Sequence, residues 1–317
     1  PTTSLVEQMY TDFQDYGWSS GTYCQKIYQG HDRKVTKDVV ISTWQSLYKM
    51  PKSYFNDFGC VVGDEAHMFK AKSLTGIMTK LHQCKYRFGL TGTLDGTQTH
   101  QLVLEGLFGA VEKVVTTKEL IDKSTLADLK IKCIILKHNN IREKMTYAEE
   151  LEFLVTNEKR TDFVVNLLRH LNGNTLCLYQ LVEKHGKILN DKMKGSENVY
   201  FVYGGTATSE REEIRSLVEK HTRSTTIASY GTFSTGINIR NIHNIVLASP
   251  SKSKIRVLQS IGRGLRTSSS KDSVLVYDIA DDISYNERRN FTLNHFTERL
   301  NIYNEEQFDY DISKVKL

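Results

Sequence analysis

Short apolar runs alternate along the chain with segments in which apolar residues recur every three or four positions. In the first part, three such runs predict buried strands at residues 39–43, 58–63 and 86–91. Between the last two, residues 73–81 have the apolar spacing of a helix that packs on a sheet. Strand–helix–strand alternation favours a parallel sheet with helices on both faces.

The second part repeats this alternation. Further strands are predicted at residues 131–136, 175–179, 198–202, 225–229, 244–248 and 273–278, and helices at 147–171, 184–194, from 208 onward, and at 286–303. Ser209 and Glu212 have the spacing of a helix-capping box. The fold class is therefore predicted to be α/β, with two tandem domains, residues 1–145 and 146–317, and mainly parallel sheets.

Composition narrows the class of protein. A length of 317 residues suits two domains, and 39% apolar residues can fill their cores. No apolar run approaches the ~20 residues of a membrane span, and the start, residues 1–4, does not have the pattern of a signal peptide. A cytoplasmic location is expected, and the protein is expected to be a monomer. Five scattered cysteines without a CxxC pair indicate reduced thiols and no structural zinc. A net charge of +5 permits nucleic acid as a partner without requiring it.

The strand predicted at 58–63 ends in two adjacent carboxylates, Asp64 and Glu65. Charges at the end of a buried strand are unfavourable unless they have a function. Asp64 would hold a hydrated Mg²⁺, and Glu65 would orient and deprotonate the water that attacks the γ-phosphate of ATP. This is the Walker B arrangement, and His67 would sense the state of the nucleotide.

The next predicted strand ends in Thr91, Gly92 and Thr93. Carboxyl ends of neighbouring parallel strands meet at one edge of a sheet, so these hydroxyls should lie beside Asp64 and Glu65. Thr91 and Thr93 would then couple the nucleotide site to the second domain by hydrogen bonds. An ordinary surface turn is the alternative, because Gly and Thr are common in turns.

Two arginines dominate the chemistry of the second half. Arg263 and Arg266 are three positions apart, and Gln259 precedes Arg263 by four, so on a helix all three share one face. Two guanidinium groups on one face suit a polyphosphate and the charge that develops during phosphoryl transfer. The internal glycines at 262 and 264 suggest a close approach of another element.

A loop rich in glycine and hydroxyl groups, residues 229–238, follows another predicted strand. Its backbone N–H groups and its side chains, Thr232 and Thr235, suit a nucleic-acid phosphate. Gly236 and Asn238 suit the ribose of a nucleotide. A surface loop without a ligand is the alternative.

In this order, these four segments resemble the motifs of superfamily-two helicases of the DEAH type. Residues 64–67 resemble motif II, 91–93 motif III, 229–238 motif V and 259–266 motif VI. The resemblance implies two RecA-like domains, with motifs Ia to III in residues 1–145 and IV to VI in 146–317. It also implies nucleic-acid contacts at Thr2 and Thr3, in motif Ia, and at Thr43, Trp44 and Gln45 in the next motif.

Three segments resemble, more narrowly, the recombination and branch-migration helicases of T-even bacteriophages: residues 63–74, 104–109 and 259–266. The resemblance implies an enzyme that uses ATP and Mg²⁺ to remodel or unwind DNA. Single-stranded, branched or forked DNA, and RNA–DNA hybrids, are the implied partners in recombination, repair and replication. The implied location is the cytoplasm of an infected bacterial host.

The sequence departs from the helicase pattern at two points. It contains no Gly-x-x-x-x-Gly-Lys-Ser/Thr loop, which would hold the phosphates and would lie before motif Ia. The first domain is therefore expected to be incomplete at its N-terminal side, in a chain that continues upstream of Pro1. Asn238 stands where many relatives have Asp, which removes a charge from motif V.

Two other functions remain open from the sequence. Without a phosphate loop the chain would be a nucleic-acid-binding module that hydrolyses no ATP. A motor that moves along duplex DNA without unwinding it is the other. Strand separation needs a wedge, and Phe108, Trp44 or the aromatic C-terminal helix are candidates for stacking on bases.

Overall fold

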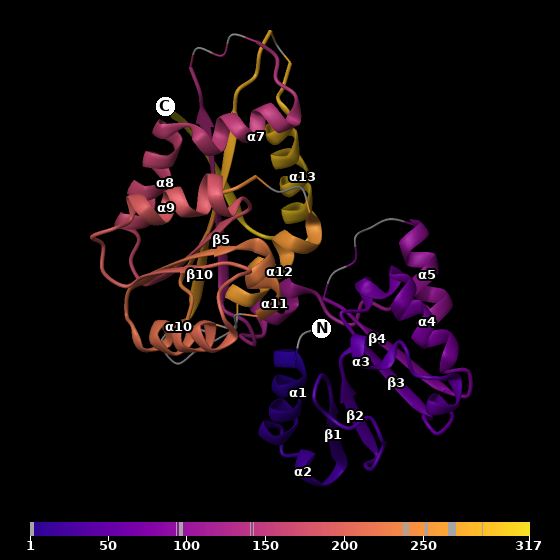
Figure 1. The fold of residues 1–317 in the computed structure, drawn as a ribbon. Coiled ribbons are helices and arrows are strands. Elements are labelled where there is room, and N and C mark those ends of the chain that lie inside the picture. The colour runs from indigo at the N-terminus through magenta and orange to yellow at the C-terminus, as the bar shows by residue number, and fades with distance from the viewer. Residues whose placement is uncertain are drawn as a thin grey trace. The chain divides into compact units, whose positions relative to one another are not determined.

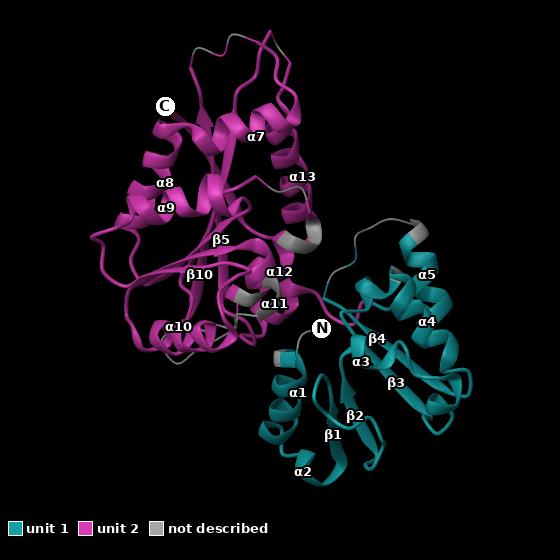
Figure 2. Ribbon diagram, viewed as in Figure 1, with its two compact units in different colours: residues 1–112 teal, residues 113–317 magenta. Residues whose placement is uncertain are grey.

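Strands and helices alternate along the whole chain in the computed structural model (Figure 1), as the hydrophobic pattern predicts. The structure describes residues 3–92, 94, 98–139, 141, 143–236, 239, 241–250, 253–265, 271–286 and 288–317. The chain divides into two units, residues 1–112 and 113–317 (Figure 2). Each is an α/β unit whose paired strands are parallel, which confirms the predicted fold class.

This division lies more than thirty residues before the boundary expected between residues 145 and 146. The reason is β5 (Asp128–Lys137), which pairs in parallel with β10 (Ser273–Asp282) and β11 (Tyr310–Lys316). From the sequence pattern, this strand was expected in the first domain. Its partners lie more than 130 positions away, and a local pattern of apolar residues contains no information about such pairing.

Unit 2 is built on one sheet of seven parallel strands, in the order β11-β5-β10-β9-β6-β8-β7. The remaining strands are β6 (Asn174–Tyr179), β7 (Val199–Val202), β8 (Ser224–Ser229) and β9 (Asn244–Leu247). Every residue of β6, β8 and β9 is buried or nearly so, as in sheets covered on both faces.

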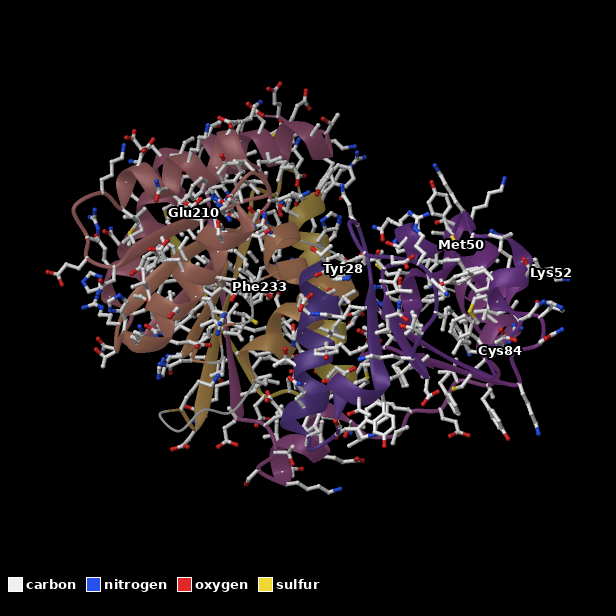
Figure 3. All side chains as sticks on the ribbon, turned by 60° about the horizontal axis from the view of Figure 1, so that its bottom comes forward. Tyr28, Met50, Lys52, Cys84, Glu210 and Phe233 are labelled. Carbon is white, nitrogen blue, oxygen red and sulfur yellow. The ribbon has the colours of Figure 1, made fainter. Side chains whose placement is uncertain are left out.

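Alternate residues of the strands supply two separate cores. Along β6, Leu176 and Leu178 belong to one core, whereas Cys177 and Tyr179 belong to the other. Five helices pack into the first core: α6 (Thr117–Asp122), α10 (Thr208–Lys220), α11 (Tyr230–Gly236), α12 (Lys254–Gly264) and α13 (Phe291–Glu305). Phe233 of α11 lies inside it and is 1% exposed (Figure 3). The opposite core is covered by α8 (Glu158–His170) and α9 (Lys187–Lys192).

Local signals set several helix ends. The helix predicted at 147–171 is two helices, α7 (Tyr147–Thr156) and α8, because the Asn157 side chain accepts a hydrogen bond from Arg160 N and starts a new helix. A capping box forms at Thr146 and Glu149. The box predicted at Ser209 and Glu212 does not form. Helix α10 begins at Thr208, as predicted, with Ala207 rather than Ser209 as its N-cap.

Unit 1 holds two separate parallel strand pairs among its described residues, β1 (Cys24–Ile27) with β2 (Val39–Ser42), and β3 (Cys60–Asp64) with β4 (Tyr86–Leu90). The prediction that residues 58–63 are a buried strand is wrong for side chains such as Val62, which is 56% exposed. Around the strands lie α1 (Thr3–Asp15), α2 (Ser20–Tyr23), α3 (Trp44–Leu47), η1 (Lys52–Phe55), η2 (Ala66–Lys70), α4 (Lys72–Lys80) and α5 (Gln98–Phe108).

In the part of the chain that the structure describes, no helix is long and apolar enough to cross a lipid bilayer. Across those same residues, no three His, Cys, Asp or Glu side chains gather into a group that could hold a metal ion. All five cysteines are free thiols.

Candidate functional site

The predicted carboxylates and hydroxyl come together at one edge of the β3–β4 pair. Asp64, the last residue of β3, is in register with Leu90, the last residue of β4. Glu65 and Thr91 follow these two residues directly. The carboxyl ends of the two parallel strands therefore present both acidic residues and the first hydroxyl of the predicted coupling segment side by side. Thr93 lies outside the described residues.

The backbone turns sharply at Glu65. This residue has φ 52° and ψ 50°, a left-handed conformation that costs a non-glycine residue roughly 1–2 kcal/mol. Its N–H donates to Asp64 Oδ1 over 2.9 Å, which stabilises the turn. Strained residues of this kind concentrate at functional sites, because the surrounding structure must hold them.

His67 connects the two strand ends. Its Nδ1 atom lies 3.2 Å from Glu65 Oε2 and 3.0 Å from Thr91 Oγ1. The imidazole is largely buried, whereas the Glu65 side chain is 42% exposed. A continuous polar path thus runs from Glu65 through His67 to Thr91.

Two glycines bring this edge close to the aromatic core of unit 1. Gly63 and Gly89 are register partners in β3 and β4. A Cβ added to Gly63 would lie 2.8 Å from the Phe69 ring, and one added to Gly89 would lie 3.0 Å from both Ala66 and Phe108. Phe108 is therefore a packing residue here, in edge-to-face contact with Phe69 at 5.1 Å between ring centroids.

The carboxylates fit the requirements of Mg²⁺ bound to a nucleotide. Protein sites for Mg²⁺ commonly use one or two carboxylates, with phosphate and water oxygens as the other ligands. The Asp64 side chain is exposed at the strand end and its Oδ1 accepts one backbone hydrogen bond. The Glu65 carboxylate beside it is partly exposed and lies 3.2 Å from His67 Nδ1.

The nucleic-acid residues predicted in unit 1 differ in accessibility. Thr3, at the start of α1, and Gln45, on α3, are exposed. Thr43 is 5% exposed, and its hydroxyl lies 3.0 Å from Ser46 Oγ, inside the unit. Trp44 is half-buried and packs edge-on against Tyr48. Thr2 lies outside the described residues.

In unit 2, the predicted phosphate-binding loop is a helix start. Ser229 ends β8, and its Oγ lies 2.7 Å from Thr232 Oγ1 and accepts from Thr232 N over 3.3 Å. Thr232 is 4% exposed, so its hydroxyl is used to begin α11. Gly236 is the last residue of α11. The side chain of Thr235, and the whole of Asn238, lie outside the described residues.

The arginine segment lies only partly within the described residues. Helix α12 contains Gln259, which is partly exposed, and Arg263, whose side chain lies outside the described part. The helix ends at Gly264, and Arg266 lies outside the described residues. The close approach inferred from the glycines is present at Gly264, where a Cβ would lie 2.5 Å from Ile245 Cδ1. It is absent at Gly262, which has open space.

Lys271 closes the C-terminal end of α12. Its Nζ donates to Gly264 O over 2.5 Å, and the side chain is buried. Burial lowers the pKa of this ammonium group to about 8. A cation at a helix C-terminus is favourable, because it meets the negative end of the helix dipole.

Sequence reasoning missed a buried polar cluster at the carboxyl edge of the unit 2 sheet. Ser249 Oγ accepts from Gln180 N over 3.1 Å and lies 2.8 Å from His185 Nδ1, while Tyr230 OH donates to Ser249 O. These contacts join segments that follow β6, β8 and β9. A serine and a histidine 64 positions apart leave no joint signal in a single sequence.

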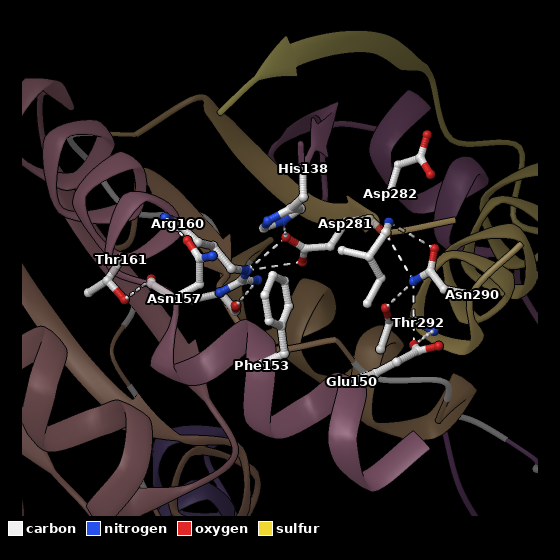
Figure 4. Close-up of polar contacts among 12 residues, drawn as sticks. His138, Glu150, Phe153, Asn157, Arg160, Thr161, Asp281, Asp282, Asn290 and Thr292 are labelled. Atoms are coloured by element: carbon white, nitrogen blue, oxygen red, sulfur yellow. Dashed lines mark hydrogen bonds and ion pairs between the residues drawn. The ribbon is translucent and has the colours of Figure 1, made fainter. Parts of the chain in front are cut away.

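A second buried cluster supports this edge (Figure 4). Arg160 donates through Nε to both oxygens of Asp281, at 2.9 and 3.0 Å, and through Nη2 to Ala248 O. His138 Nε2 lies 2.9 Å from Asp281 Oδ1. Burial raises the pKa of Asp281, but Arg160 and His138 outweigh it and hold the pKa below its usual range.

Two protein-family models match the chain, one in its N-terminal part and one in its C-terminal part. The family model described as "Type III restriction enzyme, res subunit" matches residues 1–96. The model described as "Helicase conserved C-terminal domain" matches residues 158–268. The first contains the Asp64–Thr91 edge, and the second contains the Ser229 and Gln259 segments.

Individual relatives extend this match. The ATP-dependent DNA helicase uvsW of Enterobacteria phage T4 is 36% identical over 339 aligned positions, covering 100% of this chain and 67% of the relative. A crystal structure of T4 UvsW aligns with 100% of this chain and with 66% of its own chain, at 34% sequence identity and a TM-score of 0.52. A fragment of an HsdR subunit of a type I restriction enzyme from Vibrio vulnificus YJ016 shares the fold, with a TM-score of 0.68 and 17% identity over 92% of this chain and 55% of that one.

These findings define a class, and the chain belongs to the superfamily-two helicases. One member that it matches over its full length is the phage T4 helicase uvsW, which confirms the resemblance to helicases of T-even phages. The chain spans about two thirds of the length of that relative.

Proposed function

We propose that the chain is the motor part of an ATP-dependent DNA helicase. The observation that carries this proposal is the polar path from Glu65 through His67 to Thr91 at the ends of two adjacent parallel strands. A site that only binds nucleic acid has no need of two carboxylates, one in a strained backbone conformation. The similarity to the T4 ATP-dependent DNA helicase supports the same activity.

Each acidic residue has its own role in this proposal. When bound, Mg²⁺ would supply the positive charge that polarises the γ-phosphate of ATP. Asp64 holds the metal, and Glu65 orients the attacking water and accepts its proton. Arg263 and Arg266 neutralise charge on the phosphates, and Gln259, Gly236 and Asn238 hold the nucleotide. The 317 residues contain no phosphate-binding loop, so hydrolysis requires one from outside them.

His67, Thr91 and Thr93 couple hydrolysis to movement. Because His67 touches both Glu65 and Thr91, a change in the hydrogen bonding of Glu65 after hydrolysis alters the end of β4. The end of β4 then has two arrangements, one before and one after this change, and their populations depend on whether the γ-phosphate is present. The proposal assigns the coupling to this path.

Nucleic acid is the second substrate. Thr2, Thr3 and Gln45 contact its backbone in unit 1, with Thr43 and Trp44 behind Gln45 holding the start of α3. Thr235 contacts it in unit 2, and Thr232 holds the start of α11 through Ser229. We assign motifs Ia to III to unit 1 and motifs IV to VI to unit 2, as RecA-like domains. The substrates are single-stranded, branched or forked DNA and RNA–DNA hybrids, met by a monomer in the cytoplasm of an infected bacterium.

An ATPase assay with four substrates tests this function. The product of the complete reading frame that encodes the chain is compared with the 317-residue chain on single-stranded, duplex, forked and RNA–DNA hybrid substrates. The expected result is stimulation of hydrolysis by forked DNA above the other substrates, together with strand displacement. Stimulation by duplex DNA without displacement would instead identify a translocase that does not unwind.

A nucleic-acid-binding module without ATPase activity is the alternative, and the missing phosphate loop is the observation that favours it. One simple observation distinguishes the two functions. If the complete reading frame encodes no Gly-Lys-Ser/Thr loop and its product hydrolyses no ATP, the binding module is the correct description.

A further inference from the structure

A hollow of about 360 Å³ opens in unit 2 beyond the carboxyl end of β10, away from every residue assigned above. Two segments line it, one before and within α7 and one from the end of β10 into α13. The residues used below are Lys144, Glu150, Tyr285, Arg288, Asn290 and Phe291. Its volume lies within the ~300–1,000 Å³ of small-ligand sites.

Hydrogen bonds hold the wall of this hollow in place (Figure 4). The buried Glu150 carboxylate accepts from the backbone N–H groups of Phe291 and Thr292, at 2.8 and 2.9 Å. Asn290 donates to Asp281 O and accepts from Ile283 N. Glu150 therefore caps α13, and its negative charge interacts with the positive end of the helix dipole.

The rim of the hollow is basic. Lys144, Arg288 and Arg289 are exposed. Of the carboxylates nearby, Glu149 bonds to Thr146 and Asp282 accepts from Ser284 N, whereas Glu143 is exposed next to Lys144. Among the described residues, neither Lys144 nor Arg288 has an ion-pair partner. Since the α13 N-terminus is occupied by Glu150, the groups on this rim that attract an anion are, among the described residues, Lys144, Arg288 and Arg289.

Exposed aromatic rings lie beside these cations. Phe291 is 43% exposed and Tyr147 is 39% exposed. Their rings meet edge to face, with centroids 6.4 Å apart, and Tyr147 also packs against His295 at 5.2 Å. Aromatic faces beside cations form the platforms on which proteins stack the bases of single strands.

We propose that this hollow holds one unstacked base of a single-stranded nucleic acid, on Phe291, while Lys144 and Arg288 contact the flanking phosphates. The inference rests on the proposed function, because it extends the nucleic-acid surface of the helicase. In the sheet, β10 is three strands away from β8, about 14 Å at ~4.8 Å per strand. Strand β10 also ends three residues, ~10 Å, beyond the level of Ser229, so a strand bound near the start of α11 would span both steps to reach the hollow.

Binding of a fluorescent 15-nucleotide single strand to the 317-residue chain tests this site by anisotropy over a range of salt concentrations. Lys144→Ala with Arg288→Ala should weaken binding about tenfold and reduce the salt slope by about 1.4, as expected for two lost phosphate contacts. The matched control is Lys123→Ala with Lys130→Ala, which removes the same charge from exposed sites at the opposite end of β5. Thermal melting checks that all variants fold.

Base stacking has a separate readout. Phe291→Ala should weaken binding of the normal strand about tenfold, and should have no effect on a strand whose bases have been removed. Equal weakening by the Lys144/Arg288 pair and the control pair would overturn the site, while leaving the proposed function intact. If Phe291→Ala weakened binding of the normal strand and of the strand without bases equally, or weakened neither, the proposed stacking of a base on Phe291 would be wrong. Failure of the unaltered chain to bind any strand would overturn both proposals.

Discussion

The Nδ1 atom of His67 lies 3.0 Å from Thr91 Oγ1, although 24 positions separate the two residues in the sequence. The contact exists because β3 and β4 are parallel and end in register. The same imidazole nitrogen lies 3.2 Å from Glu65 Oε2. One side chain therefore joins the Glu65 carboxylate to the end of the neighbouring strand.

Removing the Thr91 hydroxyl should uncouple hydrolysis from nucleic acid. Thr91→Val keeps the volume of the side chain but leaves His67 without this partner. The ratio of DNA-stimulated to basal ATPase in the product of the complete reading frame should fall about tenfold, while ATP affinity remains. Thr79→Val is the control, because Thr79 bonds only within α4, to Thr75 O. An unchanged ratio would remove Thr91 from the coupling path.

Glu65→Gln should stop turnover without loss of nucleotide binding. The amide keeps the size and the hydrogen-bond reach of the carboxylate, but it does not accept the proton of the attacking water. A fall in kcat of at least ~100-fold is expected, with ATP affinity within about threefold of wild type. Asp57→Asn, an exposed acid in the same unit, should change neither quantity. Retention of full turnover by Glu65→Gln would show that another group activates the water.

Much of this architecture follows from local pattern. The predicted strands at 39–43 and 86–91 are β2 and β4 within one residue, and the strand predicted at 175–179 is β6. The carboxylate edge was predictable because Asp64 and Thr91 each follow an apolar run. The capping box was mispredicted because α10 begins at Thr208 with Ala207 as its N-cap, so Ser209 lies inside the first turn and not at the cap position.

What the sequence could not supply is pairing over long distances. Strand β5 joins β10 and β11, and β11 itself has alternating polar residues that give no buried-strand signal. The cluster around Ser249 draws on three strand ends, and the hollow beside Phe291 on two segments more than 130 positions apart. Each needs the three-dimensional fold before its residues become neighbours.

The two glycines before Arg266 should respond in opposite directions to alanine. Gly264→Ala would place a methyl group 2.5 Å from Ile245 Cδ1, whose side chain is fully buried, and should destabilise unit 2 by about 1–3 kcal/mol. Gly262→Ala meets open space on the same helix and should stabilise it by up to about 1 kcal/mol. Urea unfolding followed by far-UV circular dichroism measures both. Equal effects would contradict the close packing of α12 on β9.

Asp278 should be among the residues whose loss costs unit 2 most. Its buried carboxylate accepts from Arg299 and from Tyr303 OH, at 2.7–3.0 Å and 2.8 Å. Burial, and then the Asp278 charge, raise the pKa of Tyr303 well above its usual value, so the phenol remains a donor. Asp278→Ala leaves a buried guanidinium without its carboxylate and should cost about 3–5 kcal/mol. Asp122→Ala, on an exposed ion pair, should cost less than ~1 kcal/mol.

The two units can be followed separately in that experiment. Both tryptophans, Trp18 and Trp44, lie in unit 1, so their fluorescence reports its unfolding alone. Asp278→Ala should therefore shift the circular-dichroism transition of unit 2 to lower urea and leave the fluorescence transition in place. A parallel shift of both signals would mean that the units unfold as one.

His185 should make unit 2 sensitive to acid. Burial, and then the Arg160 charge, lower the pKa of His185 to about 3, so its imidazole stays neutral beside Ser249. In the unfolded chain the imidazole takes up a proton below about pH 6.5. Between these two pH values the unfolded state binds more protons than the folded state. The free energy of unfolding therefore decreases as the pH is lowered, by up to about 1.4 kcal/mol per pH unit.

A variant without a titrating group at this position isolates the effect. His185→Asn keeps a polar atom near Ser249 Oγ but binds no proton, so it should cost stability at pH 7 and lose less than wild type on acidification. Between pH 7 and pH 4, the free energy of unfolding of wild type should decrease by about 3 kcal/mol more than that of His185→Asn. His170→Asn, on the exposed end of α8, should follow the wild-type curve. Parallel curves for His185→Asn and wild type would show that His185 is protonated in the folded unit, and that the cluster around Ser249 opens to water.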